Sequence, residues 1–173
     1  MKRITIGLVL TIISLYASVQ WKTMDIGPYG EIAIPVGLFA RDFKAGFGGG
    51  VTADILLIKK WAATASVGYM ELKGLITSGF SGRYIIPNLG TIPIRGGVKY
   101  RVTSHFYAKL EAGWAAYTSK SSGPFISYYD GGTPLLSPGI GLRIKGFDVQ
   151  AKYEVWTKNF ANQLTGIKMG WNF

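Results

Sequence analysis

The chain has 173 residues, enough for one domain, and only 16% of them are charged although the formal net charge is +10. About 25% charged residues would be usual in a soluble domain, and an aromatic content of 14% argues against a disordered chain. There is no cysteine, which excludes disulfides and any zinc or redox site that depends on thiols.

The N-terminus has the features of a secretory signal peptide. Lys2 and Arg3 precede an uncharged stretch from Ile4 to Tyr16, which is shorter than a membrane-spanning helix of roughly 20 residues. Small residues follow, so we expect cleavage between Ala17 and Trp21. The sequence therefore predicts a signal peptide at residues 1–20 and one domain at residues 21–173.

The rest of the chain alternates apolar with polar or small residues, which is the period of a β-strand. No segment keeps a helical period for three turns. Eight strands are predicted, at residues 29–39, 46–58, 61–72, 91–102, 105–117, 135–144, 147–156 and 164–173.

The connections between these strands alternate in length. Two-residue turns are expected at residues 59–60, 103–104 and 145–146, and longer links at 40–45, 73–90, 118–134 and 157–163. Within the second longer link, at 73–90, residues 83–86 could already belong to the next strand. An even number of strands, with short turns at one end and long loops at the other, is typical of a transmembrane β-barrel.

One face of every predicted strand is free of charge, and the other face combines glycines with charged residues. An eight-stranded lumen has room only for side chains or one small ligand, so more than thirty mostly large apolar groups would not fit inside. The apolar face is therefore expected to meet lipid. The charges expected inside are Glu31, Asp54, Arg95, Lys99, Arg101, Lys109, Glu111, Arg143, Asp148, Lys152, Glu154 and Lys168.

Aromatic residues on the apolar face support this orientation. One group lies beside the short turns, as expected for an interfacial girdle. Tyr69 and Trp114 lie further along their strands, about 20 Å higher at ~3.3 Å per residue and ~40° tilt, near the height expected for the second girdle. The first group consists of Trp61, Tyr100, Phe106, Phe147, Trp171 and Phe173. The sequence thus predicts an all-β fold, an eight-stranded antiparallel up-and-down transmembrane β-barrel.

Three stretches resemble the small OmpA/OmpX-like β-barrel proteins of Gram-negative outer membranes: residues 27–37, the hairpin at 42–48, and the ending Trp171-Asn172-Phe173. The resemblance covers nearly the whole mature chain. It implies a place in the cell outer membrane and recognition of the last strand, with Trp171 and Phe173, by the barrel assembly machinery. It implies no single activity.

The interior charges lead to the main functional hypothesis, because unpaired charges in a low-dielectric lumen are costly and should pair. We expect a lumen plugged by ion pairs and a structural or surface-interaction role. The alternative is a narrow pore or small-solute transport barrel, which the basic excess would make anion-favouring. A lipid-modifying enzyme and a soluble lipocalin-like binder are two further hypotheses.

Catalysis would depend on His105, the only histidine, which the topology places beside a short turn rather than at the outer leaflet. We therefore expect no enzyme activity, no cofactor and no metal site. The cations are scattered rather than massed, so no nucleic-acid partner is expected. The chain is expected to be monomeric.

The long-loop end carries residues suited to contacts outside the barrel. Its cations could pair with lipopolysaccharide phosphates, and its aromatics could bind an extracellular ligand or pack across the barrel mouth. The cations are Arg41, Lys44, Lys73, Arg83, Lys120 and Lys158, and the aromatics are Phe80, Tyr84, Phe125, Tyr128 and Tyr129.

Overall fold

The computed structural model describes residues 24–79, 82–118, 131–157 and 162–173, and the predicted signal peptide lies outside these ranges. The strands of the barrel are β1 (Met24–Val36), β2 (Phe43–Ile58), β3 (Trp61–Gly74), β6 (Leu89–Arg101), β7 (Phe106–Tyr117), β8 (Gly132–Ile144), β9 (Phe147–Trp156) and β10 (Asn162–Trp171). A short 3₁₀ helix, η2 (Gly37–Arg41), follows β1, and β4 (Ile76–Gly79) and β5 (Gly82–Ile85) lie between β3 and β6.

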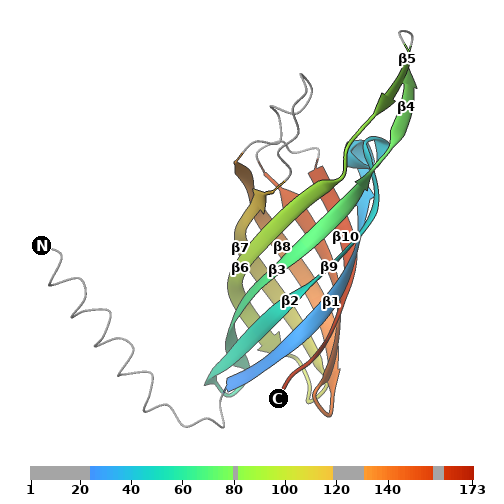
Figure 1. Cartoon of the computed structure of the whole chain (residues 1–173). Helices are drawn as coiled ribbons and strands as arrows, with labels where there is room; N and C mark the ends of the chain where they lie inside the picture. Colours follow the sequence, from blue (N-terminus) through green and yellow to red (C-terminus); the bar gives the residue numbers. More distant parts are fainter. Residues whose placement is uncertain (1–23, 80–81, 119–130, 158–161) are drawn as a thin grey trace, which may run out of the picture.

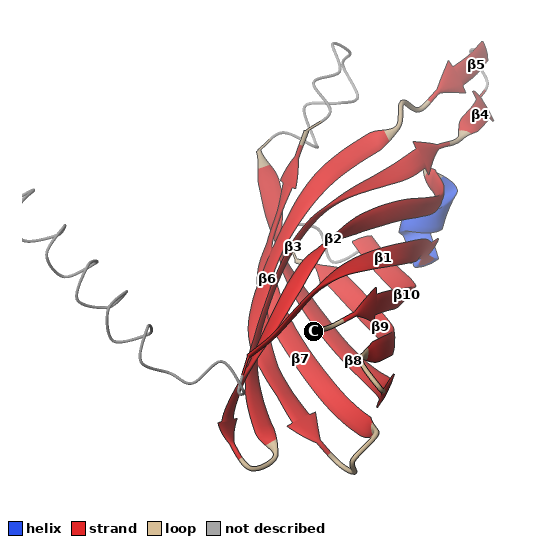
Figure 2. Cartoon of the chain, turned by 60° about the horizontal axis from the view of Figure 1, so that its bottom comes forward, coloured by secondary structure: helices blue, strands red, loops and turns tan. Residues whose placement is uncertain are grey.

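The eight barrel strands form one closed antiparallel sheet in the order β1-β10-β9-β8-β7-β6-β3-β2 (Figure 1). Every strand pairs with its neighbour in sequence, and β1 closes the barrel by pairing with β10. Figure 2 brings the short-turn end forward and shows these strands surrounding a single interior. The predicted eight-stranded up-and-down barrel is thus confirmed.

Most strand ends differ from the predicted ones by at most three residues, and two segments differ in more than this. β1 begins at Met24 rather than Tyr29, because the alternation continues back through Asp25 and Ile26 despite Gly27 and Pro28. It ends at Val36, because Gly37 has a left-handed φ of 64° and starts η2 where strand was expected.

The long link after β3 also differs, because it contains a hairpin of its own. Residues 82–85 form β5, which pairs with β4 in a separate two-stranded sheet rather than starting the fourth barrel strand. This ribbon projects beyond the barrel at the long-loop end (Figure 1).

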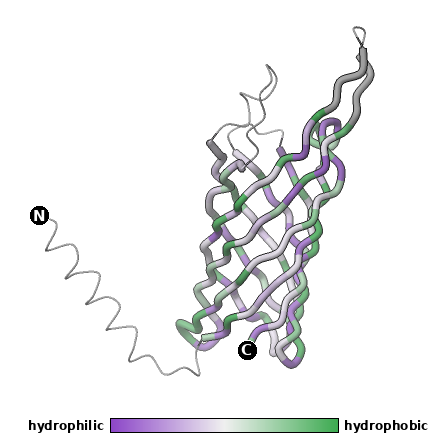
Figure 3. The backbone as a smooth tube through the Cα atoms, viewed as in Figure 1, coloured by the Kyte–Doolittle hydropathy of each residue, from purple (hydrophilic) through white to green (hydrophobic). Residues whose placement is uncertain are grey.

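The two faces of the strands separate as the alternation predicts. In β6, Ile94 is 55% exposed on the outside whereas its neighbour Arg95 is 2% exposed inside. Hydrophobic and hydrophilic positions alternate along the backbone in the same way around the barrel (Figure 3). This arrangement is the opposite of a soluble lipocalin-type barrel and is that of a transmembrane barrel, whose outer surface meets lipid.

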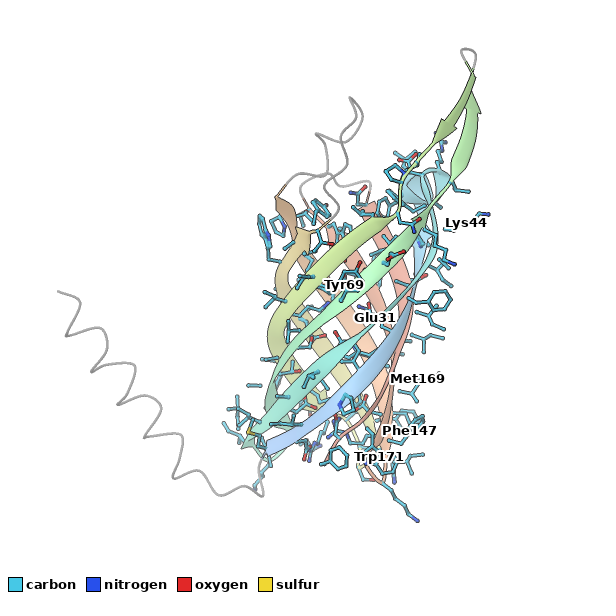
Figure 4. All side chains as sticks on the ribbon, in the orientation of Figure 1. Glu31, Lys44, Tyr69, Phe147, Met169 and Trp171 are labelled. Atoms are coloured by element: carbon cyan, nitrogen blue, oxygen red, sulfur yellow. The ribbon has the colours of Figure 1, made fainter. Side chains whose placement is uncertain are left out.

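Aromatic side chains mark the short-turn end of the outer surface. The rings of Trp61 and Tyr100 pack with their centroids 4.8 Å apart. Phe147 and Trp171 lie on the outside near the same end, and Tyr69 lies further along the barrel (Figure 4). Within the described ranges, no helix is long and apolar enough to cross a membrane.

Candidate functional site

The candidate site is the barrel interior, where all twelve predicted charged residues lie on inward positions of the strands. Nine of them are buried, and Arg101, Arg143 and Asp148 near the short turns are partly exposed. The buried nine are Glu31, Asp54, Arg95, Lys99, Lys109, Glu111, Lys152, Glu154 and Lys168.

A central cluster joins three strands across the lumen and consists of Glu31, Arg95, Lys152 and Glu154. Arg95 Nη2 lies 3.3 Å from Glu31 Oε1 and 2.9 Å from Glu154 Oε2. Lys152 Nζ contacts the same two oxygens at 2.7 and 3.0 Å. Two cations and two carboxylates thus balance one another, with Trp156 Nε1 donating a further hydrogen bond of 2.8 Å to Glu154. Each charge therefore has the compensation that burial in a low-dielectric interior requires.

A second pair lies beside the central cluster. Lys109 Nζ is 3.0 Å from Glu111 Oε1, and both residues belong to β7. Ser66 Oγ from β3 donates to the same carboxylate oxygen at 3.4 Å. Charge again balances locally.

A short-turn cluster lies nearer the short turns and consists of Asp25, Asp54, Lys99, Arg143 and Asp148. Lys99 Nζ is 2.6 Å from Asp54 and 3.4 Å from Asp148. Arg143 contacts Asp54 at 2.9 Å, Asp148 at 3.0 Å and also Asp25. This guanidinium therefore joins β1, β2 and β9 to its own strand β8.

Sequence reasoning missed two members of this region. Asp25 lay before the predicted start of the first strand, although it continues the inward alternation; besides Arg143 it contacts Arg101, at 3.8 Å. Tyr107 was not singled out, and its hydroxyl donates to Asp148. A signal was available, because Tyr107 occupies an inward position and its cross-strand partner is Gly141. The ring needs that glycine, since a Cβ on Gly141 would overlap it.

The apolar seal is the other feature that sequence reasoning missed, and it fills the interior at the long-loop end. Phe39, turned inward by η2, packs against Phe43 and Trp156 with ring centroids 4.9 and 5.5 Å apart. Tyr117 packs on Trp156 from β7, and Trp156 is fully buried. The buried residues of the seal are Ala33, Phe39, Phe43, Met70, Leu72, Leu89, Ala115, Leu135, Trp156 and Leu164.

Among the described residues, the charged half of the interior holds a larger and a smaller cavity. The larger, about 260 Å³, lies at the short-turn mouth, where Lys99, Arg143, Tyr107, His105 and Asn172 are among its lining residues. The smaller, about 10 Å³, lies deeper and shares Lys99 and Asn172 with the larger.

His105 lies at the rim of the larger cavity, exposed beside a short turn as predicted. Its Nδ1 is 2.9 Å from Ser104 Oγ. Within the described ranges, no group of three or more His, Asp or Glu side chains could hold a metal ion.

The long-loop end presents Arg41, Lys44 and Lys73 as exposed cations. Lys44 points away from the barrel wall in Figure 4. The other predicted contact residues lie outside the part of the chain whose side chains are described: Arg83, Lys120, Lys158, Phe80, Tyr84, Phe125, Tyr128 and Tyr129.

The predicted assembly signal lies at the other end. Trp171 ends β10 with its side chain outside the barrel, and Phe173 is 82% exposed. The Phe173 amide donates to the Ile26 carbonyl at 3.0 Å, which ties the chain end to β1. Its role in recognition stays a prediction.

No protein-family model and no curated protein matches this chain. Among solved structures, it is similar to a chain described as "De novo design of transmembrane beta-barrels", with 16% identity, a TM-score of 0.55, and coverage of 86% of this chain and 95% of that one. It is also similar to the outer membrane protein Ail of Yersinia pestis in a phospholipid bilayer nanodisc, with 15% identity, a TM-score of 0.50, and coverage of 85% and 99%. These likenesses show the fold, a small transmembrane β-barrel.

Proposed function

We propose that this chain is an outer-membrane β-barrel whose lumen is closed to ions and solutes, and whose role is structural or surface interaction at the long-loop end. The observation that carries the proposal is the filled interior. The apolar seal spans the long-loop end, and balanced ion pairs occupy the region below it. A solute would have to displace both layers.

The proposed site of contact with the surroundings is the long-loop end. Arg41, Lys44 and Lys73 are exposed there, at the level where the phosphates of lipopolysaccharide would lie. Reversing Lys44 and Lys73 to Glu together should lower binding of the refolded barrel to lipopolysaccharide, and unchanged binding would exclude this contact. We propose no catalytic role, since His105 and Ser104 lie at the opposite end from this surface.

Single-channel recording in planar bilayers tests the closed lumen. The wild-type barrel should be silent, and a variant with Phe39→Ala and Trp156→Ala should conduct more, because it empties the centre of the apolar seal. Leu38→Ala, on the outward side of η2, is the matched control and should stay silent. Steady anion-selective openings of the wild type would instead favour the alternative of a narrow transport pore.

A further inference from the structure

The interior charges do not balance when all of them are considered. Among the described inward positions, six carboxylates face seven cations. The carboxylates are Asp25, Glu31, Asp54, Glu111, Asp148 and Glu154, and the cations are Arg95, Lys99, Arg101, Lys109, Arg143, Lys152 and Lys168.

Lys168 accounts for the surplus cation. Its Nζ is buried and has no hydrogen-bond partner among the described residues, whereas the other six cations each contact a carboxylate. The ammonium lies 3.8 Å from the centroid of the Tyr29 ring, and its cross-strand neighbour Glu31 already pairs with Arg95 and Lys152. A cation–π contact compensates only part of the cost of burying a charge.

Lys168 lines the smaller cavity, between the central and short-turn clusters. Lys99 and Lys109 line it too, but each of them pairs with a carboxylate, Lys99 with Asp54 and Lys109 with Glu111. Lys168 is therefore the unpaired cation at this cavity. The Gln150 amide is a further donor there without a partner.

The cavity also has unpartnered acceptors, Asp54 Oδ1 and Asn172 Oδ1. Because the oxygen and nitrogen of an amide exchange places on rotation, Asn172 can present its NH₂ group instead. Asp54 is already held by Lys99 and Arg143. The electrostatic balance at the cavity therefore favours a negative occupant.

We propose that this cavity binds one small monovalent inorganic anion, such as chloride, which neutralises Lys168. The volume of about 10 Å³ is about the least that one water molecule needs, so only a single small ion can enter, and the side chains around it must shift to admit chloride. The larger cavity, which shares Lys99 and Asn172, supplies the entry route, and the apolar seal closes the other end. The anion therefore exchanges only from the short-turn side. Exchange from one side only rests on the proposed closed lumen, whereas binding of the anion does not.

The test is the ³⁵Cl NMR linewidth of chloride with the full chain refolded in a zwitterionic detergent. The wild-type protein should broaden the chloride line beyond its width in detergent alone. Bromide should remove this excess width by displacing the bound chloride. Lys168→Met should lower the excess at least tenfold, whereas Lys145→Met, the same change at an exposed turn lysine, should leave it intact.

A second measurement covers the case in which Lys168→Met does not fold. The unfolding midpoint of wild type should be higher in chloride than in gluconate at equal ionic strength, because a ligand that binds only the folded state stabilises it. Equal midpoints, no excess broadening in wild type, or equal broadening in Lys168→Met would overturn the site and leave one water as the occupant. These measurements are made in micelles, which carry no transmembrane gradient. A barrel that conducts in planar bilayers would therefore contradict the closed lumen without changing the result for anion binding.

Discussion

The stability of the barrel should depend on the charge balance of the central cluster, and Arg95→Met tests this most sharply. Arg95 is buried and contacts both Glu31 and Glu154. Its removal leaves two buried carboxylates with Lys152 as their shared cation. Methionine keeps much of the side-chain volume, so the lost charge rather than a cavity should dominate the effect.

Breaking a buried ion pair by removing one partner typically costs about 3–5 kcal/mol, because an uncompensated charge stays buried. We expect Arg95→Met to lower the free energy of unfolding by this amount. Adding Glu154→Gln restores the charge balance, since Lys152 still lies 2.7 Å from Glu31. The double variant should therefore recover more than half of the loss.

Urea unfolding of the refolded barrel in lipid vesicles, followed by tryptophan fluorescence and by gel mobility with and without boiling, measures these changes. Arg41→Met, at an exposed arginine, is the control and should change the stability by less than about 0.5 kcal/mol. The reasoning fails if Arg95→Met costs less than about 1 kcal/mol, or if Glu154→Gln adds to the loss instead of relieving it.

Three further variants probe other parts of the barrel. Gly141→Ala should cost about 1–3 kcal/mol in urea unfolding, because its Cβ would meet the Tyr107 ring, and Tyr107→Ala in the same chain should relieve the clash. Leu110→Lys, on the outer face midway between the two aromatic bands, should cost about 2–4 kcal/mol in vesicles, and a cost near zero would contradict a lipid-facing position. Deleting Phe173 should slow barrel assembly in cells, measured as the delay before the heat-modifiable band forms, while leaving refolding in detergent unchanged.

Much of the fold could be predicted because alternation has a period of two, and a shift by one residue would move every charge to the lipid face. Arg95 and Ile94 illustrate this, since their opposite faces follow directly from the pattern. The ends of the strands were harder. At Gly27 and Pro28 local turn propensities masked a strand that pairing with β2 holds in place.

The sequence predicted which charged residues lie inside the barrel, but not how they pair or that an apolar seal lies above them. The charges of the central cluster were identified from their inward positions, whereas the partners of each charge depend on strands that are distant in sequence, such as Arg95 with Glu31. The apolar seal also had a signal, since inward positions become apolar at the long-loop ends of the strands, as at Leu72, Leu135 and Leu164. Phe39 also had a signal, since it shares the inward parity of Glu31 in the predicted strand at 29–39, although η2 rather than that strand holds it inside.

The most direct test of the account is fluorescence quenching of a variant that keeps Trp156 as its only tryptophan. Trp156 is fully buried inside the barrel, beneath Phe39 and Tyr117. In vesicles it should resist both aqueous acrylamide and lipids with brominated acyl chains, whereas a variant keeping only Trp114, on the outer face, should be quenched by the lipid. Quenching of Trp156 by acrylamide would show an open lumen, and quenching by brominated lipid would show that the faces of the barrel are inverted.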